Sequence, residues 1–160
     1  MITQEYIKQL FTYADGNLYW RISRSNCIKV GQKVGTTPKH NYAQTYLDGK
    51  SYRVHRLIFL YHHGYLPAEI DHIDRNARNN RIENLRAATR VQNQQNAKLR
   101  KDNLSGTAGV YWFKQTNKWK VQINIDKVKT HLGYFKDKEL AELVAIEARD
   151  KYHKEFARHK

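Results

Sequence analysis

Residues 70–96 read IDHIDRNARNNRIENLRAATRVQNQQN, and this stretch decides how the rest of the chain is interpreted. It has few apolar residues for its length, so it is poorly suited to build a hydrophobic core. It places Asp71 next to His72 and continues through Asn84 to Asn93. Carboxylate, imidazole and amide groups supply acid, base and metal-ligand chemistry in proteins. A functional interpretation of this stretch is therefore favoured over a purely structural one.

Basic charge is spread over the whole chain. The sequence has 160 residues, which suits one large domain or two small ones, and a net charge of +14. Residues 1–97 carry 14 Lys and Arg against 7 Asp and Glu, and residues 98–160 carry 15 against 8, so each part contributes +7. Such a distribution indicates a polyanion-binding surface, with nucleic acid as the expected partner. No long apolar run is present, and we expect no membrane partner.

Cysteine usage and the N-terminal residues bear on location. Cys27 is the single cysteine, which excludes a disulfide framework and a zinc site built from cysteines. The first residues, Met-Ile-Thr-Gln-Glu-Tyr, lack the basic start and apolar run of a signal peptide. We therefore expect a cytoplasmic location.

Short elements are expected along the first part of the chain. The first is a helix over 4–11 capped by Thr3, followed by a strand over 17–22 after Asp15-Gly16. A short strand is possible near Val34, and a hairpin of 42–47 with 51–54 is expected around Asp48-Gly49. A buried helix over 55–61 then ends near Gly64. The polar stretch itself predicts a strand over 69–74, a loop over 75–83, a strand fragment and a helix over 90–97.

The pattern changes after an expected linker over 98–104. Three strands are expected over 109–114, 119–125 and 129–135. Asp137 then caps an expected helix with an apolar stripe of Leu140, Ala141, Val144, Ala145 and Ala148. The overall fold class is α+β. Alternation along 119–125 predicts a solvent-facing side that carries Lys120, Gln122 and Asn124, groups suited to phosphates and base edges.

The chemistry of the polar stretch fits phosphodiester cleavage. Water must lose a proton, and His72 has a side chain suited to that task. A hard divalent cation prefers oxygen ligands, which Asp71 and Asn93 can supply. Neighbouring residues on a strand point to opposite faces, so Asp71 and His72 share a site only if the strand is distorted there.

Residues 52–97 resemble the phage-type branch of the HNH endonucleases. The resemblance lies in Tyr52 to Leu57, Ile70 to Asp74, Asn79 to Arg86 and Asn93 to Asn96. It implies a nuclease domain over residues 1–97, in which a ββα-metal module with its core motif at 52–97 follows an N-terminal β-rich extension. In that module His72 would be the general base, Asp71 and Asn93 would bind one divalent metal ion, and Asn84 would brace the loop and orient His72. Asparagine at position 93 favours Mg²⁺ or Mn²⁺ over zinc.

Residues 105–158 resemble an AP2 DNA-binding domain, which we place at 105–160. The resemblance lies in residues 105–112, 118–123, 131–135 and 155–157. It implies a three-stranded sheet in the major groove, with a contact face of Tyr111, Phe113, Lys120, Gln122, Asn124, Lys129 and His131. The arginines Arg75, Arg78, Arg81, Arg86 and Arg90 beside the first module are interpreted as a grip on the DNA backbone.

The two modules together are similar to those of phage HNH homing endonucleases. This similarity implies an enzyme that cuts double-stranded DNA at a preferred site, in the cytoplasm of an infected bacterium, as a monomer or weak dimer without a small-molecule cofactor. Two alternatives stay open. One is a DNA-binding regulator with an idle nuclease site, and the other is a nuclease without sequence preference.

Overall fold

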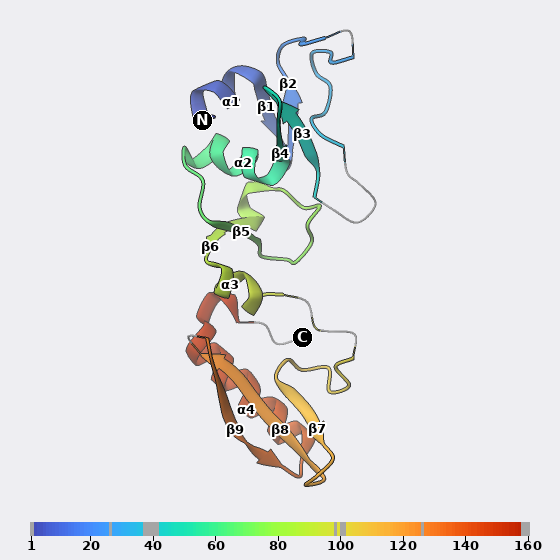
Figure 1. Ribbon diagram of the computed structural model, residues 1–160, viewed down its shortest axis with the longest axis vertical. Helices are drawn as coiled ribbons and strands as arrows, with labels where there is room; N and C mark the ends of the chain where they lie inside the picture. The colour runs from blue at the N-terminus through green and yellow to red at the C-terminus, as the bar shows by residue number, and fades with distance from the viewer. Residues whose placement is uncertain are drawn as a thin grey trace. The chain divides into compact units, whose positions relative to one another are not determined.

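The computed structural model describes residues 2–25, 27–36, 42–97, 99, 102–125 and 127–157. Its contacts divide the chain into two compact units, Met1–Thr89 and Arg90–Lys160. Each unit has its own helices and strands, as Figure 1 shows. Each also has its own hydrophobic core.

The first unit begins with a helix and a hairpin. Helix α1 spans Gln4–Leu10, and the side chain of Thr3 accepts a hydrogen bond from the Tyr6 amide, as the capping pattern predicts. Strands β1 (Phe11–Ala14) and β2 (Asn17–Trp20) pair antiparallel around Asp15 and Gly16, which both have positive φ. The sequence pattern missed β1, because Phe11 also fits the apolar face of the preceding helix. Strand β2 also ends two residues earlier than expected.

A second hairpin follows a long connection. Strands β3 (Gln44–Leu47) and β4 (Lys50–Arg53) pair antiparallel around Asp48 and Gly49, which confirms the predicted hairpin. The short strand expected near Val34 is absent from the described residues. That segment forms only isolated bridges, and Val34 itself is buried in the core. Residues 37–41 lie outside the described part of the chain.

Helix α2 is the centre of the first core. It spans Val54–His63 and ends at Gly64, which adopts the left-handed conformation that glycine favours at helix ends. Its buried side chains pack with those of α1 and both hairpins, including Phe11, Leu18 and Leu47. Figure 1 shows α2 lying alongside these elements. The buried helix predicted over 55–61 is confirmed, and the observed helix begins one residue earlier and ends two residues later.

The polar stretch forms a second, smaller hairpin. Strand β5 (Glu69–His72) pairs antiparallel with β6 (Leu85–Ala88), and a long loop between them ends in the 3₁₀-helix η1 (Ile82–Asn84). Strand β5 ends two residues earlier than predicted. Ile70 and Leu85 join the core of the unit, so the hairpin is anchored by its few apolar residues while its polar ones are left for other contacts.

The second unit contains one sheet and its covering helix. Helix α3 spans Arg90–Gln95. The strands that follow it are β7 (Val110–Phe113), β8 (Lys118–Ile125) and β9 (Val128–Phe135). They pair antiparallel in the order β7-β8-β9. A register shift lies between Val121 and Gln122. The three predicted strands are confirmed, and α3 ends two residues earlier than predicted. Residues 98, 100 and 101 of the expected linker lie outside the described residues.

Helix α4 (Lys138–His153) covers one face of this sheet, and the short 3₁₀-helix η2 (Lys154–Phe156) follows it. The side chain of Asp137 caps α4 at the Leu140 amide, as predicted. The predicted apolar stripe is wrong at Leu140, which is 50 % exposed. The buried face of α4 consists of Ala141, Ala145, Arg149 and His153, so small residues near its start give way to polar ones near its end.

The two units together contain helices and small antiparallel sheets, which agrees with the expected α+β class. Among the described residues, no helix is long and apolar enough to span a bilayer.

Burial of His55 at the start of α2 makes the first unit sensitive to acid. Burial is the main cause that lowers the pKa of His55 to about 3, and repulsion from His72, Arg53 and Arg56 adds to it. The unfolded chain therefore binds a proton near pH 6.5 that the folded chain rejects until about pH 3. This contribution of His55 to the free energy of unfolding is complete above pH 6.5, and it is lost as the pH falls from 6.5 to about 3.

We expect the free energy of unfolding to fall by roughly 2–3 kcal/mol from this group between pH 7 and pH 4.5. The neutral variant His55→Gln should lack that component, and His131→Gln, which changes an exposed histidine, should retain it. Urea unfolding at both pH values measures the difference. The same acid dependence in wild type and His55→Gln would contradict the assignment.

Candidate nuclease site

Asp71 and His72 end strand β5, and both side chains are buried. The β5–β6 pairing runs through them without a register shift, so the two side chains leave the strand in opposite directions. The distortion that a shared site would require of this strand is not present. Each residue has its own set of contacts instead.

Asp71 forms an ion pair with its cross-strand partner. Arg86 lies opposite Asp71 in the register, and its Nε donates to Asp71 Oδ2 at 2.8 Å while a terminal nitrogen lies 2.7 Å from the same oxygen. Both side chains are largely buried. A buried carboxylate needs such compensation, because loss of hydration penalises an unpaired charge. Arg86, predicted from the sequence as a DNA contact, thus has an intramolecular carboxylate partner.

His72 is held by three neighbours. Its Nε2 lies 3.0 Å from Asn80 Oδ1, and because an amide oxygen only accepts, Nε2 carries the proton. The neutral ring then has its lone pair on Nδ1. The ring of Tyr42 stacks on that of His72 at 5.8 Å, and His55 meets it edge to face at 5.2 Å. The Arg53 guanidinium lies over the ring of Tyr42, 4.9 Å from the ring centre.

The loop between β5 and β6 is closed by hydrogen bonds between its two ends. The Asp74 amide donates to Asn84 Oδ1 at 2.9 Å, and Asn84 Nδ2 donates to Asp74 Oδ1 at 2.9 Å. Asn84 Nδ2 also donates to the Asn79 carbonyl, and Asn79 Nδ2 donates to Asp74 Oδ2. Asn84 therefore braces the loop, and the side chain that holds the His72 ring is Asn80.

These hydrogen bonds determine the ionisation of Asp74. Burial alone opposes its charged form, but the bonds from Asn79, the Asn76 amide and Asn84 lower the pKa of Asp74 overall. The carboxylate stays ionised and keeps both oxygens as acceptors for the loop.

The N-terminal hairpin supports the same loop. Tyr13 Oη accepts a hydrogen bond from the Ile82 amide at 3.0 Å. Gly16 lies so close to the loop that a Cβ placed on it would be 2.8 Å from the Arg81 nitrogen. Contacts from residues far away in sequence therefore fix the loop that presents Asn80 to His72.

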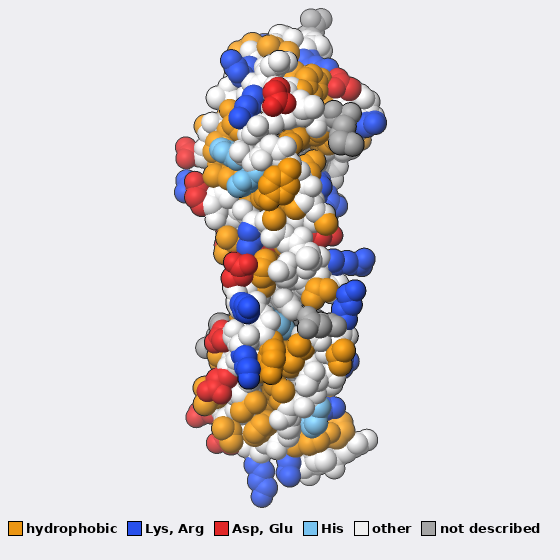
Figure 2. All heavy atoms as spheres, turned by 90° about the vertical axis from the view of Figure 1, so that its left-hand side faces the viewer, with side chains coloured by type: hydrophobic (Ala, Val, Ile, Leu, Met, Phe, Trp, Pro, Cys, Tyr) orange, Lys and Arg blue, Asp and Glu red, His pale blue; other side chains and the backbone are white. Residues whose placement is uncertain are grey.

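The remaining predicted backbone contacts are exposed. Arg75, Arg78 and Arg81 lie on the loop, and Arg90 begins α3. Figure 2 shows exposed Lys and Arg side chains interspersed with Asp and Glu.

The second predicted metal ligand, Asn93, lies in α3 and thus in the second unit, whereas Asp71 lies in the first. Among the described residues, no group of three or more His, Cys, Asp or Glu side chains forms a metal-binding cluster. The expected donors are one carboxylate and one amide oxygen, a set that suits a hard cation rather than zinc.

The solvent-facing side of the sheet in the second unit gathers the residues predicted there. Lys120 lies across from Tyr111 on one side and Tyr134 on the other, and its Nζ is 5.4–5.8 Å from the rings of Tyr111, Phe113 and Tyr134. The register pairs Gln122 with His131 and Asn124 with Lys129 on the same face. Tyr134 is an addition to the predicted set. Trp119, on the other face, is half-buried against the core, as its position in the strand predicts.

Sequence reasoning missed three residues of the His72 environment. Asn80 lies in the quoted motif beside Asn79, but nothing local distinguishes which asparagine reaches the imidazole. Tyr42 lies thirty positions before His72, and its ring contact is visible only in the fold. His55 begins the predicted buried helix, but its contact with the His72 ring was not foreseen.

Comparisons with known proteins identify the family of the chain. Residues 52–95 match the family model described as HNH endonuclease. Protein 3.8 of Escherichia phage T7 is 37% identical over 91 residues, which cover 56% of this chain and 73% of that protein. No solved structure matches the chain. The chain therefore belongs to the family of phage T7 Protein 3.8 and carries an HNH endonuclease domain at residues 52–95.

Proposed function

We propose that this protein is a metal-dependent DNA endonuclease, and more narrowly a phage homing endonuclease that hydrolyses double-stranded DNA at a preferred site. The observation that carries the proposal is the environment of His72. Its ring is buried, hydrogen-bonded to Asn80, stacked on Tyr42, met edge to face by His55, and adjacent in sequence to the carboxylate of Asp71. These contacts hold the imidazole in one orientation, as a general base requires.

His72 would take a proton from the attacking water through Nδ1. The bond from Nε2 to Asn80 fixes the tautomer, because it keeps the proton on the nitrogen that faces Asn80. Asn84 would act as a positioning residue, because it closes the loop that carries Asn80 rather than contacting the ring itself. The phosphate would be gripped by Arg75, Arg78, Arg81 and Arg90.

Asp71 and Asn93 would bind one Mg²⁺ or Mn²⁺ ion. Their oxygens fit a hard cation, and the buried Asp71 carboxylate is already held in one orientation by Arg86. A divalent ion bound there supplies positive charge for the phosphate and for the leaving oxygen. Arg86 competes with the ion for Asp71, so affinity in the absence of DNA should be modest.

DNA binding by the second unit would determine the position at which the first unit cuts. Its basic, amide-bearing sheet face, with Lys120 surrounded by aromatic rings, supports an AP2-like DNA-binding domain. Under this proposal residues 1–97 are the nuclease domain, 98–104 the linker and 105–160 the DNA-binding domain. The protein would act as a monomer or weak dimer and need no small-molecule cofactor.

Replacing the proposed base should abolish cleavage without affecting binding. Purified protein with Mg²⁺ is expected to nick or linearise plasmid DNA, and His72→Ala should lower the rate by at least about 100-fold. A gel-shift assay should show unchanged DNA affinity for that variant. His63→Ala, which changes an exposed histidine of α2, is the matched control. Equal cleavage by wild type and His72→Ala would contradict the assignment, and binding without cleavage by wild type would favour a regulator with an idle site.

Metal binding should depend on Asp71. A chelator is expected to stop cleavage, and the number of Mn²⁺ ions bound per chain, measured by electron paramagnetic resonance, should fall from one to none in Asp71→Asn. Asp48→Asn changes an exposed carboxylate that pairs with Arg24, and it should bind Mn²⁺ as wild type does. Unaltered Mn²⁺ binding by Asp71→Asn would remove this residue from the ligand set.

Asn80 should affect rate rather than substrate affinity. Asn80→Ala removes the acceptor that fixes the His72 tautomer, and kcat should fall about 10- to 100-fold with KM nearly constant. Asn80→Asp keeps an oxygen acceptor at the same place and should restore most of the rate. If Asn80→Ala cleaves as fast as wild type, then the bond does not orient the base.

A further inference from the structure

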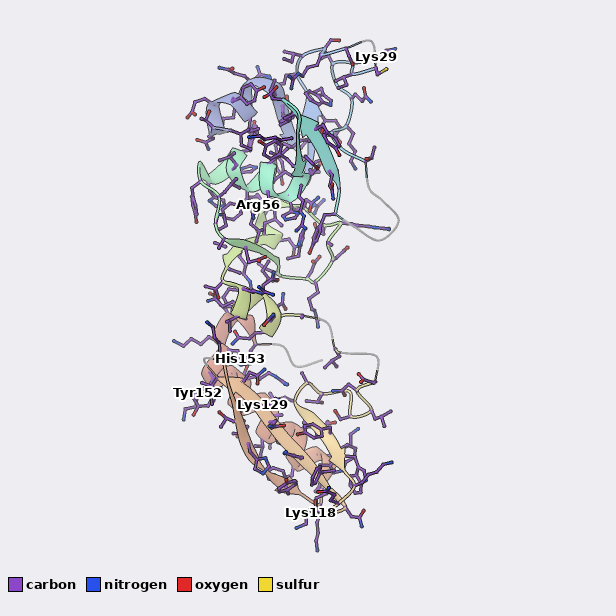
Figure 3. All side chains as sticks on the ribbon, viewed as in Figure 1. Lys29, Arg56, Lys118, Lys129, Tyr152 and His153 are labelled. Carbon is purple, nitrogen blue, oxygen red and sulfur yellow. The ribbon has the colours of Figure 1, made fainter. Side chains whose placement is uncertain are left out.

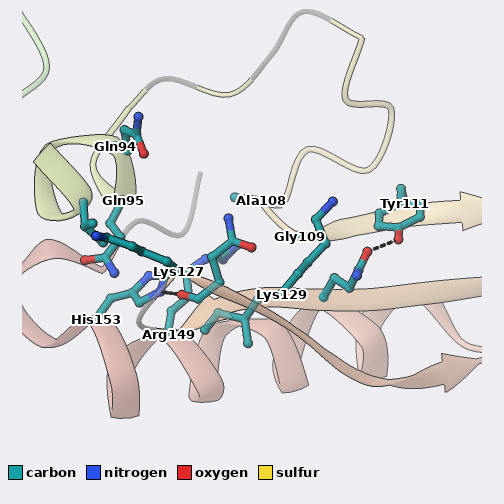
Figure 4. Close-up of a pocket in the computed structure, with 13 residues that line it drawn as sticks. Gln94, Gln95, Ala108, Gly109, Tyr111, Lys127, Lys129, Arg149 and His153 are labelled. Atoms are coloured by element: carbon teal, nitrogen blue, oxygen red, sulfur yellow. Dashed lines mark hydrogen bonds between the residues drawn. The ribbon is translucent and has the colours of Figure 1, made fainter.

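A cleft of about 620 Å³ lies within the second unit, at the end of the sheet where β8 turns into β9. Figure 4 shows its walls: Gln94 and Gln95 from α3, Ala108 and Gly109 before β7, Lys127 and Lys129 around the turn, and Arg149 and His153 from α4. No function has been assigned above to the cleft as a whole.

The charge of this cleft has one sign. Lys127, Lys129 and Arg149 line it, and no Asp or Glu is among the described lining residues. Four amide side chains complete the polar wall: Gln94, Gln95, Gln122 and Asn124. Such a lining favours an anionic ligand that also has hydrogen-bonding edges.

His153 adds a specific requirement. Its Nε2 lies 2.8 Å from the Asn124 carbonyl oxygen, and because a carbonyl only accepts, Nε2 carries the proton. Nδ1 is buried without a hydrogen-bond partner among the described residues, and the residue is 9 % exposed. In the neutral ring Nδ1 is an acceptor. A buried acceptor in a cleft wall is satisfied by a ligand that offers an N–H or O–H group.

Size restricts the ligand further. The volume lies in the range of pockets that enclose one small molecule, so a duplex cannot enter. One nucleotide that has left the base stack meets every requirement, because it combines anionic phosphate oxygens with N–H groups on its base. Leaving the stack costs a few kcal/mol in a paired strand and least where the base is already unpaired.

The short helix α3 relates this cleft to the proposed cut. Val91, Gln94 and Gln95 line the cleft at helical spacing, which puts Asn93 on the opposite face of the same helix. A nucleotide in the cleft would therefore contact the helix that carries a proposed metal ligand.

We propose that this cleft is a binding subsite for a single unpaired nucleotide of the DNA substrate, an inference that rests on the proposed function. Lys127 and Lys129 hold the phosphate. The amide side chains and His153 Nδ1 hold the base edge.

The test compares two DNA duplexes that differ by a single-nucleotide bulge. Fluorescence anisotropy is measured with the full chain carrying His72→Ala, so that cleavage does not interfere. The bulged duplex should bind about tenfold more tightly than the fully paired one. In the same background, Lys127→Gln with Lys129→Gln should reduce that preference to about unity.

Lys118→Gln is the matched control. Lys118 is a lysine of β8 at the opposite end of the sheet from Lys129 and His153, as Figure 3 shows, and it does not line the cleft. This variant should weaken binding to both duplexes alike and keep the preference. Equal affinity of the parent protein for the two duplexes would overturn the proposal, as would a preference that survives in the double variant.

Nitrogen-15 resonances of the His153 ring give a second readout that does not depend on the lysines. Addition of thymidine 5′-monophosphate should shift the Nδ1 resonance, because the base imide donates to it, whereas inorganic phosphate should leave Nδ1 unchanged. No shift with the nucleotide would overturn the role of His153. Because these measurements report binding, they can succeed where wild-type cleavage fails, and the two proposals are thus tested separately.

Discussion

The reciprocal pair of hydrogen bonds between Asp74 and Asn84 is the constraint on which the candidate site depends. It joins the two ends of a long polar loop that has almost no apolar side chains to fix it. The Asp74 carboxylate also accepts from the Asn76 amide and from Asn79, so one ionised group organises most of the loop. Because the charged carboxylate accepts three of these hydrogen bonds, from Asn76, Asn79 and Asn84, the loop gains order without a hydrophobic core.

Closure of the loop has a chemical consequence. Asn80 lies inside it and reaches back to His72, so the tautomer of the imidazole depends on bonds made several residues away. Tyr13 and Gly16 of the N-terminal hairpin hold the far side of the same loop. The small apolar core around α2 thus supports the site indirectly. It packs against the β1–β2 hairpin, which in turn contacts the loop between β5 and β6. Buried polar groups need hydrogen-bond or ionic partners, and Arg86 is such a partner for Asp71, as Asn80 is for His72.

Local signals predicted the elements well where turn chemistry was strong. Asp48-Gly49 marked its hairpin and Gly64 its helix end, because few other residues adopt positive φ at low cost. Strand β1 was missed because Phe11 satisfies a helical period and a strand period equally. Leu140 was misplaced because it is the first apolar residue of α4, where the stripe already turns away from the sheet. The chemical identity of Asp71 and His72 could be inferred from the motif. Their partners could not, since Tyr42 and Asn80 reach His72 only through long-range packing and loop closure.

We propose that this buried histidine, presented by a closed polar loop, makes the HNH domain a site-selective DNA nuclease. Run-off sequencing of both strands of phage genomic DNA after incubation with the protein and Mg²⁺ tests this proposal most directly. We expect new strand ends concentrated at one preferred locus with wild type, and none with His72→Ala. Ends scattered without preference would contradict site selection, and identical ends from both proteins would contradict the role of His72.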